Sequence, residues 1–391
     1  MSSTFNIPDE FIGIVINEGT RGVVEEEINE ILEQNSELNI ILNISELKRD
    51  LIAEESSSVF RKQGNEVLVL NVNSKNHNKD YNNSLLNIFK KLLTLRSANK
   101  VLYCVNRDNM DNTGVLRDFI KEFNSVIFQF KGDFKKHKEE LENLGVKLDL
   151  KKNNGFIHEL ILKDNSQLKD TSQRELTHPK SFLCFEVKNQ NNREYRFFNH
   201  TRTLRPSIIY SILRMSGFNK GFNGKLLDLT SISPFCLEAM DYLIKTIGID
   251  GVKELDELRF YSISFSDRIL NIIKKNFVVG KLDEYFSERT IFWSGNILDF
   301  LRETTEEFDI VIGQFLFLNK NFIIKLLPYL LEKSKTTILI FDKSIDEEEF
   351  KHIFKGAMFV KGDMFVVSKT RIMQGGRSLF LIKMSYTNEK S

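Results

Sequence analysis

Residue types that often carry catalysis or bind metals are scattered in this chain. The cysteines Cys104, Cys184 and Cys236 lie far apart, without a CxxC pair or a histidine cluster beside them. This spacing argues against a disulfide framework and a zinc site, so we expect no bound metal and a reducing compartment. The histidines occupy unrelated contexts, and no Ser-His-Asp or Cys-His arrangement is legible. No Walker-type GKS/T loop is present either.

Charge is distributed unevenly, although the formal net charge is only +1. Residues 1–60 contain 13 Asp and Glu against three Lys and Arg, whereas residues 121–225 contain 20 Lys and Arg against 12 Asp and Glu. A basic region of this kind is compatible with a nucleic-acid surface and equally with an ordinary solvated face. Its densest cluster consists of Lys131, Lys135, Lys136, His137 and Lys138.

Length and composition indicate a globular protein of two to three domains. The 391 residues are 41% hydrophobic and 28% charged, and the 33 phenylalanines can fill sizeable cores. The start MSSTFNIPDEF lacks a basic segment followed by an apolar one, and apolar runs such as 310–318 reach half a membrane span at most. We therefore expect a soluble intracellular protein, cytoplasmic or nuclear, that does not enter a membrane.

Strand and helix patterns alternate through the first half of the chain. Strands are expected at residues 11–16, 67–72, 100–105, 126–130, 155–162 and 182–187, and helices at 23–32, 84–95, 115–123 and 134–144. This alternation predicts an α+β layer fold. The polar stretch at 189–193 is a candidate hinge to the second half.

The alternation becomes regular after residue 203. Strands at 225–228, 259–263, 291–293, 308–312 and 337–341 are interleaved with helices, and two β runs at 364–368 and 378–384 follow. This order predicts an α/β domain with a doubly wound sheet that ends in an antiparallel hairpin. Thr203 is expected to cap a helix with Pro206 near its first position. The acidic run from Asp342 is interpreted as the N-terminus of a helix at 347–354.

Several segments resemble the THUMP-domain RNA guanosine-N2 methyltransferases, a family that acts on tRNA and rRNA. The similar segments are 18–32 (EGTRGVVEEEINEIL), 92–105 (LLTLRSANKVLYCV), 128–162, 194–215 (EYRFFNHTRTLRPSIIYSILRM) and 359–385 with Gly375 and Gly376. The resemblance implies a ferredoxin-like subdomain at 1–110, a THUMP-like RNA-binding region at 111–193 and a Rossmann-type methyltransferase domain at 194–391. It also implies S-adenosylmethionine as cofactor and RNA as partner.

The resemblance places the cofactor site on the ends of three strands. Asp228 and Ser231 belong to the turn after the first strand, Ser264 takes the position of the ribose-binding acid, and Asn296 takes that of the acid near adenine. The glycines that let the backbone approach a ligand are replaced in this turn by Ser231 and Ile232. A β-branched Ile232 is expected to resist the positive φ of such a glycine.

The catalytic Asp/Asn-Pro-Pro-Tyr motif of the family corresponds to Gln314-Phe315-Leu316-Phe317. By this resemblance Gln314 would hold the target amine and Phe317 would stack on the base. The resemblance also assigns RNA contact to Lys131, Lys135, Lys136, Lys138, Arg202 and Arg205.

Four functions remain open from the sequence. The first is an RNA-binding relative of these enzymes whose catalysis is impaired or lost, acting alone or with a protein partner. The second is a working S-adenosylmethionine-dependent RNA methyltransferase with divergent motifs. The third is a subunit like the non-catalytic one of the tRNA adenosine-N1 methyltransferase, and the fourth is a scaffold without an RNA role.

Overall fold

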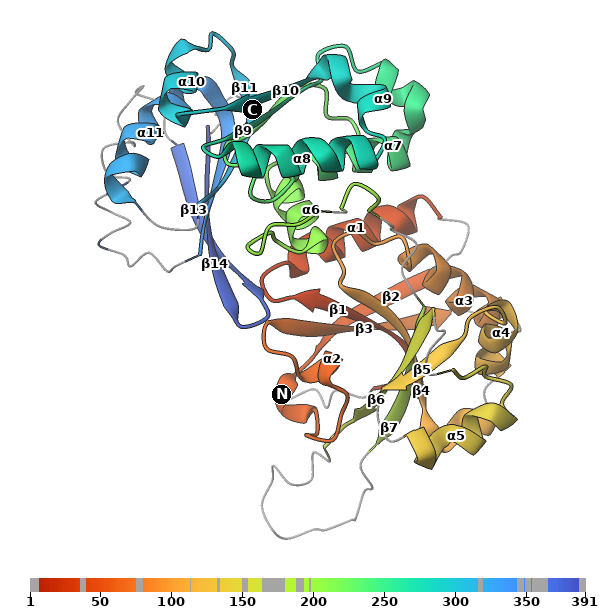
Figure 1. Cartoon of the computed structure of the whole chain (residues 1–391). Helices are drawn as coiled ribbons and strands as arrows, with labels where there is room; N and C mark the ends of the chain where they lie inside the picture. The colour runs from red at the N-terminus through yellow and green to blue at the C-terminus, as the bar shows by residue number, and fades with distance from the viewer. Residues whose placement is uncertain are drawn as a thin grey trace. The chain divides into compact units, whose positions relative to one another are not determined.

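The chain forms two compact units, Met1–Asn191 and Asn192–Ser391. The computed structural model describes residues 7–35, 40–74, 80–112, 114–131, 134–149, 154–163, 180–187, 193–196, 198–315, 319–342, 348, 353 and 365–386. Within these ranges each unit is built around one seven-stranded sheet (Figure 1).

The sheet of the first unit has the order β2-β3-β1-β4-β7-β6-β5. Its strands are β1 (Glu10–Asn17), β2 (Ile40–Leu47), β3 (Asn65–Ser74), β4 (Lys100–Asn106), β5 (Phe128–Lys131), β6 (Gly155–Ile161) and β7 (Ser181–Val187). Neighbours are antiparallel except β5 and β6, which are parallel. One sheet thus contains strands of both expected subdomains, 1–110 and 111–193. The boundary between these subdomains stays a prediction.

Helices pack on the apolar faces of this sheet. They are α1 (Arg21–Glu33), α2 (Ser58–Arg61), α3 (Asp80–Leu92), α4 (Gly114–Glu122) and α5 (Phe134–Asn143). The larger core joins α1, α3, α4 and α5 to one face, and a smaller core on the other face includes Val59 and Phe60 of α2. The expected α+β class is confirmed. Strand β2, an edge strand that pairs only with β3, was missed.

A buried carboxylate joins α1 to the loop before β4. Glu27 accepts hydrogen bonds from the amides of Arg96 (2.8 Å) and Ser97 (3.0 Å) and from the Ser97 hydroxyl. Burial raises the pKa of Glu27, and these hydrogen bonds oppose the rise. This contact links the acidic helix to the LRSA segment of the sequence.

Glu27→Gln is expected to lower the free energy of unfolding of the first unit by about 1–3 kcal/mol, because an amide NH₂ would face donors that need an acceptor. Urea denaturation of the full chain measures the change. The exposed Glu33→Gln on the same helix is the control. Equal stability of the two variants would contradict the prediction.

The sheet of the second unit has the order β10-β9-β8-β11-β12-β14-β13. Its strands are β8 (Lys225–Asp228), β9 (Arg259–Ser264), β10 (Thr290–Ser294), β11 (Phe308–Phe315), β12 (Ser334–Phe341), β13 (Phe365–Gln374) and β14 (Arg377–Tyr386). The strands from β10 to β12 are parallel, and β14 is antiparallel to both β12 and β13. The predicted Rossmann-type sheet with a terminal antiparallel hairpin is confirmed (Figure 1).

Helices cover both faces of this second sheet. They are α6 (Pro206–Met215), α7 (Phe235–Lys253), α8 (Asp267–Val279), α9 (Asp283–Phe286), α10 (Ile297–Glu303) and α11 (Lys320–Lys333). Residues of α6 to α9 pack on one face, and residues of α10 and α11 pack on the other. Among the described residues, no helix is long and apolar enough to cross a membrane.

One local expectation for this unit is wrong. The residue before α6 is Arg205, with Pro206 at the first helical position, whereas the Thr203 hydroxyl donates to the Ile232 carbonyl (3.1 Å). Asp342 follows β12 and pairs with Arg377. The interpretation of the acidic run as a helix N-terminus stays a prediction. The predicted helix at 347–354 lies outside the described residues, apart from positions 348 and 353.

Candidate functional site

A cavity opens at the carboxyl ends of the parallel strands. The chain passes from β8 to β9 and β10 on one side and returns to β11 and β12 on the other, so β8 and β11 flank the switch point where α/β sheets bind ligands. The cavity has a volume of about 340 Å³. It is lined by Thr230, Ile232, Ser264, Phe265, Ser266, Ile269, Gln314, Phe315, Asn319 and Phe322.

The described lining of this cavity is aromatic and uncharged. Phe265 has an exposed fraction of 52% and makes an edge-to-face contact with Phe322, with 5.5 Å between the ring centres. The ring centres of Phe315 and Phe322 are 6.1 Å apart. None of the described lining residues has an ionisable side chain. Sequence reasoning missed Phe265 and Phe322. Their signal was an aromatic residue directly after β9 and another in the first turn of α11.

Asp228 ends β8 and is fully buried below the turn that follows. Its Oδ1 accepts hydrogen bonds from the amides of Ser231 (2.9 Å) and Thr230 (3.3 Å), and its Oδ2 has no partner among the described residues. Burial raises the pKa of Asp228 to about 7, against the lowering effect of the amides of Ser231, Thr230 and Phe235. Asp228 therefore organises its own turn and does not line the cavity.

Ser231 adopts the backbone conformation that glycine usually supplies in such a turn. Its φ is +52°, in the left-handed region, whereas Ile232 has no positive φ. The turn therefore does not require a positive φ at Ile232, and the expected backbone strain there is absent. The Ser231 hydroxyl bonds to Ser262 Oγ (2.7 Å) and donates to the Ile263 carbonyl (2.9 Å), so it holds the turn against β9.

Ile232 stands between the main cavity and a much smaller one. The smaller cavity, of about 10 Å³, is bordered by Ser231, Ile232 and Pro234 of the turn and by the segment near His200. That volume admits about one water molecule. Ile232 and Ile269 of α8 line both cavities, so these two side chains lie between them. Pro234 precedes α7 and has no N–H to offer a ligand.

Ser264 and Asn296 lie in different surroundings. Ser264 ends β9, lines the main cavity and accepts a hydrogen bond from the Ser266 amide (3.2 Å). Asn296 is exposed and caps α10 by accepting from the Leu298 amide (3.1 Å), and it is not part of the cavity lining. The structure thus brings Ser264 and Gln314 together but not Asn296, and their roles in cofactor binding stay predictions.

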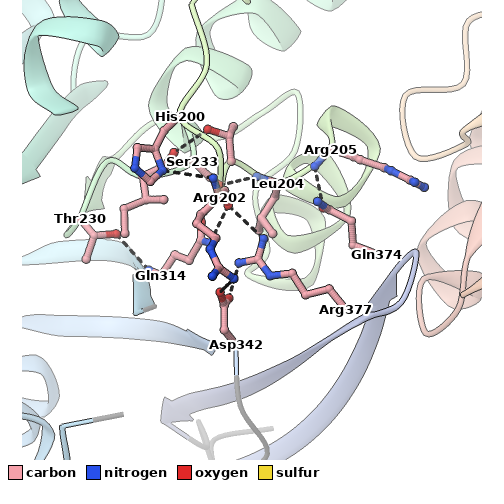
Figure 2. A network of polar contacts seen from close by, with 12 residues as sticks. His200, Arg202, Leu204, Arg205, Thr230, Ser233, Gln314, Asp342, Gln374 and Arg377 are labelled. Carbon is pink, nitrogen blue, oxygen red and sulfur yellow. Dashed lines mark hydrogen bonds and ion pairs between the residues drawn. The ribbon is translucent and has the colours of Figure 1, made fainter. Parts of the chain in front are cut away.

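Gln314 is fully buried, and its amide group has partners on both sides (Figure 2). Its Oε1 accepts from the Ser233 hydroxyl (2.6 Å), and its Nε2 donates to the Arg202 carbonyl (3.2 Å). Its backbone N–H donates to Thr230 Oγ1 (3.2 Å). Phe317, the other predicted catalytic residue, lies outside the described residues.

The chain from His200 to Arg205, called the 200–205 segment below, is tied to the carboxyl end of the sheet (Figure 2). The Arg202 carbonyl also accepts from Arg377 Nη1 (3.1 Å), and the guanidinium of Arg377 pairs with Asp342. The Arg202 guanidinium, 55% exposed, lies 3.7 Å from Asp342.

Backbone amides add two further ties. Those of Leu204 and Arg205 donate to Ser233 Oγ and Gln374 Oε1, each at 2.9 Å. The Arg205 side chain extends away from Gln314 and Asp342 in Figure 2.

Side-chain amides and carboxylates also hold the chain just before this segment. Asn276 of α8 donates to the Phe198 carbonyl (2.6 Å) and accepts from its amide (2.7 Å). Glu238 of α7, fully buried, accepts from Arg193 and from the Tyr195 hydroxyl. Sequence reasoning assigned no role to these groups. They position the chain that leads to the cavity.

The basic residues predicted to contact RNA in the first unit are only partly described. Lys131 is exposed at the end of β5, with its ammonium 4.5 Å from the centre of the Phe156 ring. Lys138 is exposed on α5 and lies 3.8 Å from Glu142. The side chains of Lys135 and Lys136 fall outside what the structure describes.

Comparison with known proteins identifies the fold. No family model matches the sequence, and no curated protein matches it. Among solved structures, TrmN from Thermus thermophilus is similar, with a TM-score of 0.53 and 13% identity over 96% of this chain and 99% of that one. A possible methylase from Clostridium difficile 630 has the same TM-score and identity, over 98% and 99% of the two chains. This chain therefore shares the fold of these two proteins over nearly its whole length.

Proposed function

We propose that this protein is an RNA-binding relative of the S-adenosylmethionine-dependent tRNA and rRNA methyltransferases that has lost methyl transfer. The observation that carries the proposal is that both polar atoms of the Gln314 side chain are hydrogen-bonded within the protein. A residue that positions a target amine needs an acceptor oxygen turned toward the substrate. The Oε1 of Gln314 instead accepts from Ser233, and its Nε2 is bonded to the 200–205 segment.

The poor fit of the amino-acid half of S-adenosylmethionine supports the same proposal. Its adenosyl half matches the size and aromatic lining of the main cavity. Its amino-acid half needs room and free N–H groups at the turn before α7. There the cavity is about 10 Å³, the amides of Thr230 and Ser231 donate to Asp228, and Pro234 has no N–H. The residues present do not fit this half of the cofactor.

The purified full chain is expected to bind tRNA without methylating it. Incubation with methyl-labelled S-adenosylmethionine and cellular RNA should leave no label in the RNA. Filter binding should show affinity that falls steeply between 50 and 200 mM salt, as phosphate contacts require. Incorporation of label would overturn the loss of catalysis, and salt-independent or absent binding would overturn the RNA role.

The proposed RNA surface includes Lys131 and Lys138. The double variant Lys131→Gln, Lys138→Gln should lower the slope of log affinity against log salt by about two. Lys253→Gln, an exposed lysine of the second unit, is the control.

A working methyltransferase remains the second candidate because Ser231 keeps the left-handed turn of a glycine. That candidate predicts label in the RNA and loss of cofactor binding in Asp228→Ala.

A further inference from the structure

The described lining of the main cavity lacks the charged groups that would pair with those of S-adenosylmethionine. S-adenosylmethionine has a sulfonium, an ammonium and a carboxylate, and buried charges need partners. The described lining offers hydroxyl, amide and aromatic groups but no ionisable side chain. Asp228, the nearest acid of the turn, is bonded to backbone amides of that turn. The lining therefore suits an uncharged, flat, polar ligand.

We propose that this cavity binds an uncharged nucleoside and excludes S-adenosylmethionine, with Ile232 of the turn and Ile269 of α8 as the residues that set the limit. The proposal rests on the proposed function, since it names the ligand of a site where methyl transfer is lost. It covers a free nucleoside and an unpaired nucleoside of an RNA strand, which present the same ring and ribose.

The aromatic residues can hold the ring of such a ligand. Phe265 is half-exposed at the mouth of the cavity, and Phe322 and Phe315 continue the same wall. Bases stack on aromatic side chains without regard to sequence.

Polar groups lie beside this wall. The hydroxyl oxygens of Thr230 and Ser264 each accept one backbone N–H, and each hydroxyl has a proton to donate to a ring nitrogen or a ribose oxygen.

Ile232 determines how far a ligand can extend toward the turn before α7. Its side chain and that of Ile269 line both the cavity of about 340 Å³ and that of about 10 Å³, and Ile232 is the one that belongs to the turn. The proposal places the ribose 5′ carbon toward this side chain, so a 5′ substituent longer than one or two atoms is expected to meet it. Glycine at position 232 is expected to widen the space between the two cavities, and alanine to widen it less, with Ile269 still in place.

Calorimetric titration of the full chain with adenosine, 5′-methylthioadenosine and S-adenosylmethionine tests the proposal. Both nucleosides are expected to bind the wild type, and S-adenosylmethionine at least tenfold more weakly. Phe265→Ala should weaken both nucleosides roughly tenfold or more, because stacking is lost. Val278→Ala, an exposed apolar position on α8, should change nothing. Ile232→Gly and the milder Ile232→Ala should reduce the difference in affinity between the nucleosides and S-adenosylmethionine. Circular dichroism checks that each variant is folded.

Binding of S-adenosylmethionine to the wild type as tight as that of adenosine would overturn the proposal, as would no nucleoside binding at millimolar concentration. Displacement of 5′-methylthioadenosine by a single-stranded RNA oligonucleotide would assign the site to a base of RNA, and its persistence would assign it to a free nucleoside. Both results support the proposal. Label transfer to RNA would overturn the proposed function, whereas absent nucleoside binding without label transfer would overturn only this inference.

Discussion

Glu238→Ala is expected to lower the free energy of unfolding of the second unit by about 3–5 kcal/mol. Glu238 is fully buried in α7 and accepts from Arg193 Nε (2.9 Å) and Nη2 (3.2 Å) and from the Tyr195 hydroxyl. Removing the carboxylate leaves the Arg193 guanidinium, 11% exposed, in a site of low polarity without its counter-charge. Chemical denaturation followed by near-ultraviolet circular dichroism measures the loss.

A matched control lies in the last turn of α7, beyond the kink at Gly248. Asp250 forms a surface ion pair with Lys253 at 2.9 Å, and Asp250→Ala should change stability little because exposed pairs contribute little. The double variant Glu238→Met, Arg193→Met should recover part of the loss, because it removes the stranded charge as well. A double variant no more stable than Glu238→Ala would show that the ion pair is not the cause.

Asp228→Asn is expected to remove most of a pH dependence from the stability of the second unit. The folded state raises the pKa of Asp228 from 3.8 to about 7, so between these values the folded chain binds more protons than the unfolded one. The contribution of the protonated Asp228 carboxyl to stability is therefore fully present below pH 4 and is lost as the pH rises toward 7. Above pH 7 the stability no longer depends on this group. A carboxyl with such a pKa costs about 4 kcal/mol when ionised.

Urea denaturation at several pH values between 4 and 8 measures this effect. The neutral amide keeps an oxygen for the amides of Ser231 and Thr230, so the variant should be more stable than the wild type at pH 8 and similar to it near pH 4. Asp256→Asn, an exposed position of the same unit, should leave the pH profile unchanged. Parallel profiles for wild type and Asp228→Asn would contradict the raised pKa.

The doubly wound sheet could be predicted because its central strands β8, β9, β11 and β12 are largely buried. Residues 225–228 were expected as a strand and form β8 (Lys225–Asp228), and 308–312 form the first part of β11. Buried parallel strands read as continuous apolar runs, and helices between them show the period of one apolar face. The short helices α9 and α10 were missed because four and seven residues are too few to show a clear helical period, and the eight-residue edge strand β2 was missed as well.

The sequence by itself also determined which residues stand at the carboxyl ends of the strands, including Asp228, Ser264 and Gln314. Only the tertiary structure decided what these side chains contact. Gln314 meets Ser233 and Arg202, which are 81 and 112 residues away in the chain, and Ile232 lies between two cavities whose walls come from separate elements. Local patterns report how a segment buries its own apolar face. The partners of a side chain depend instead on strand order and on how distant helices and loops pack, and no local pattern contains that information.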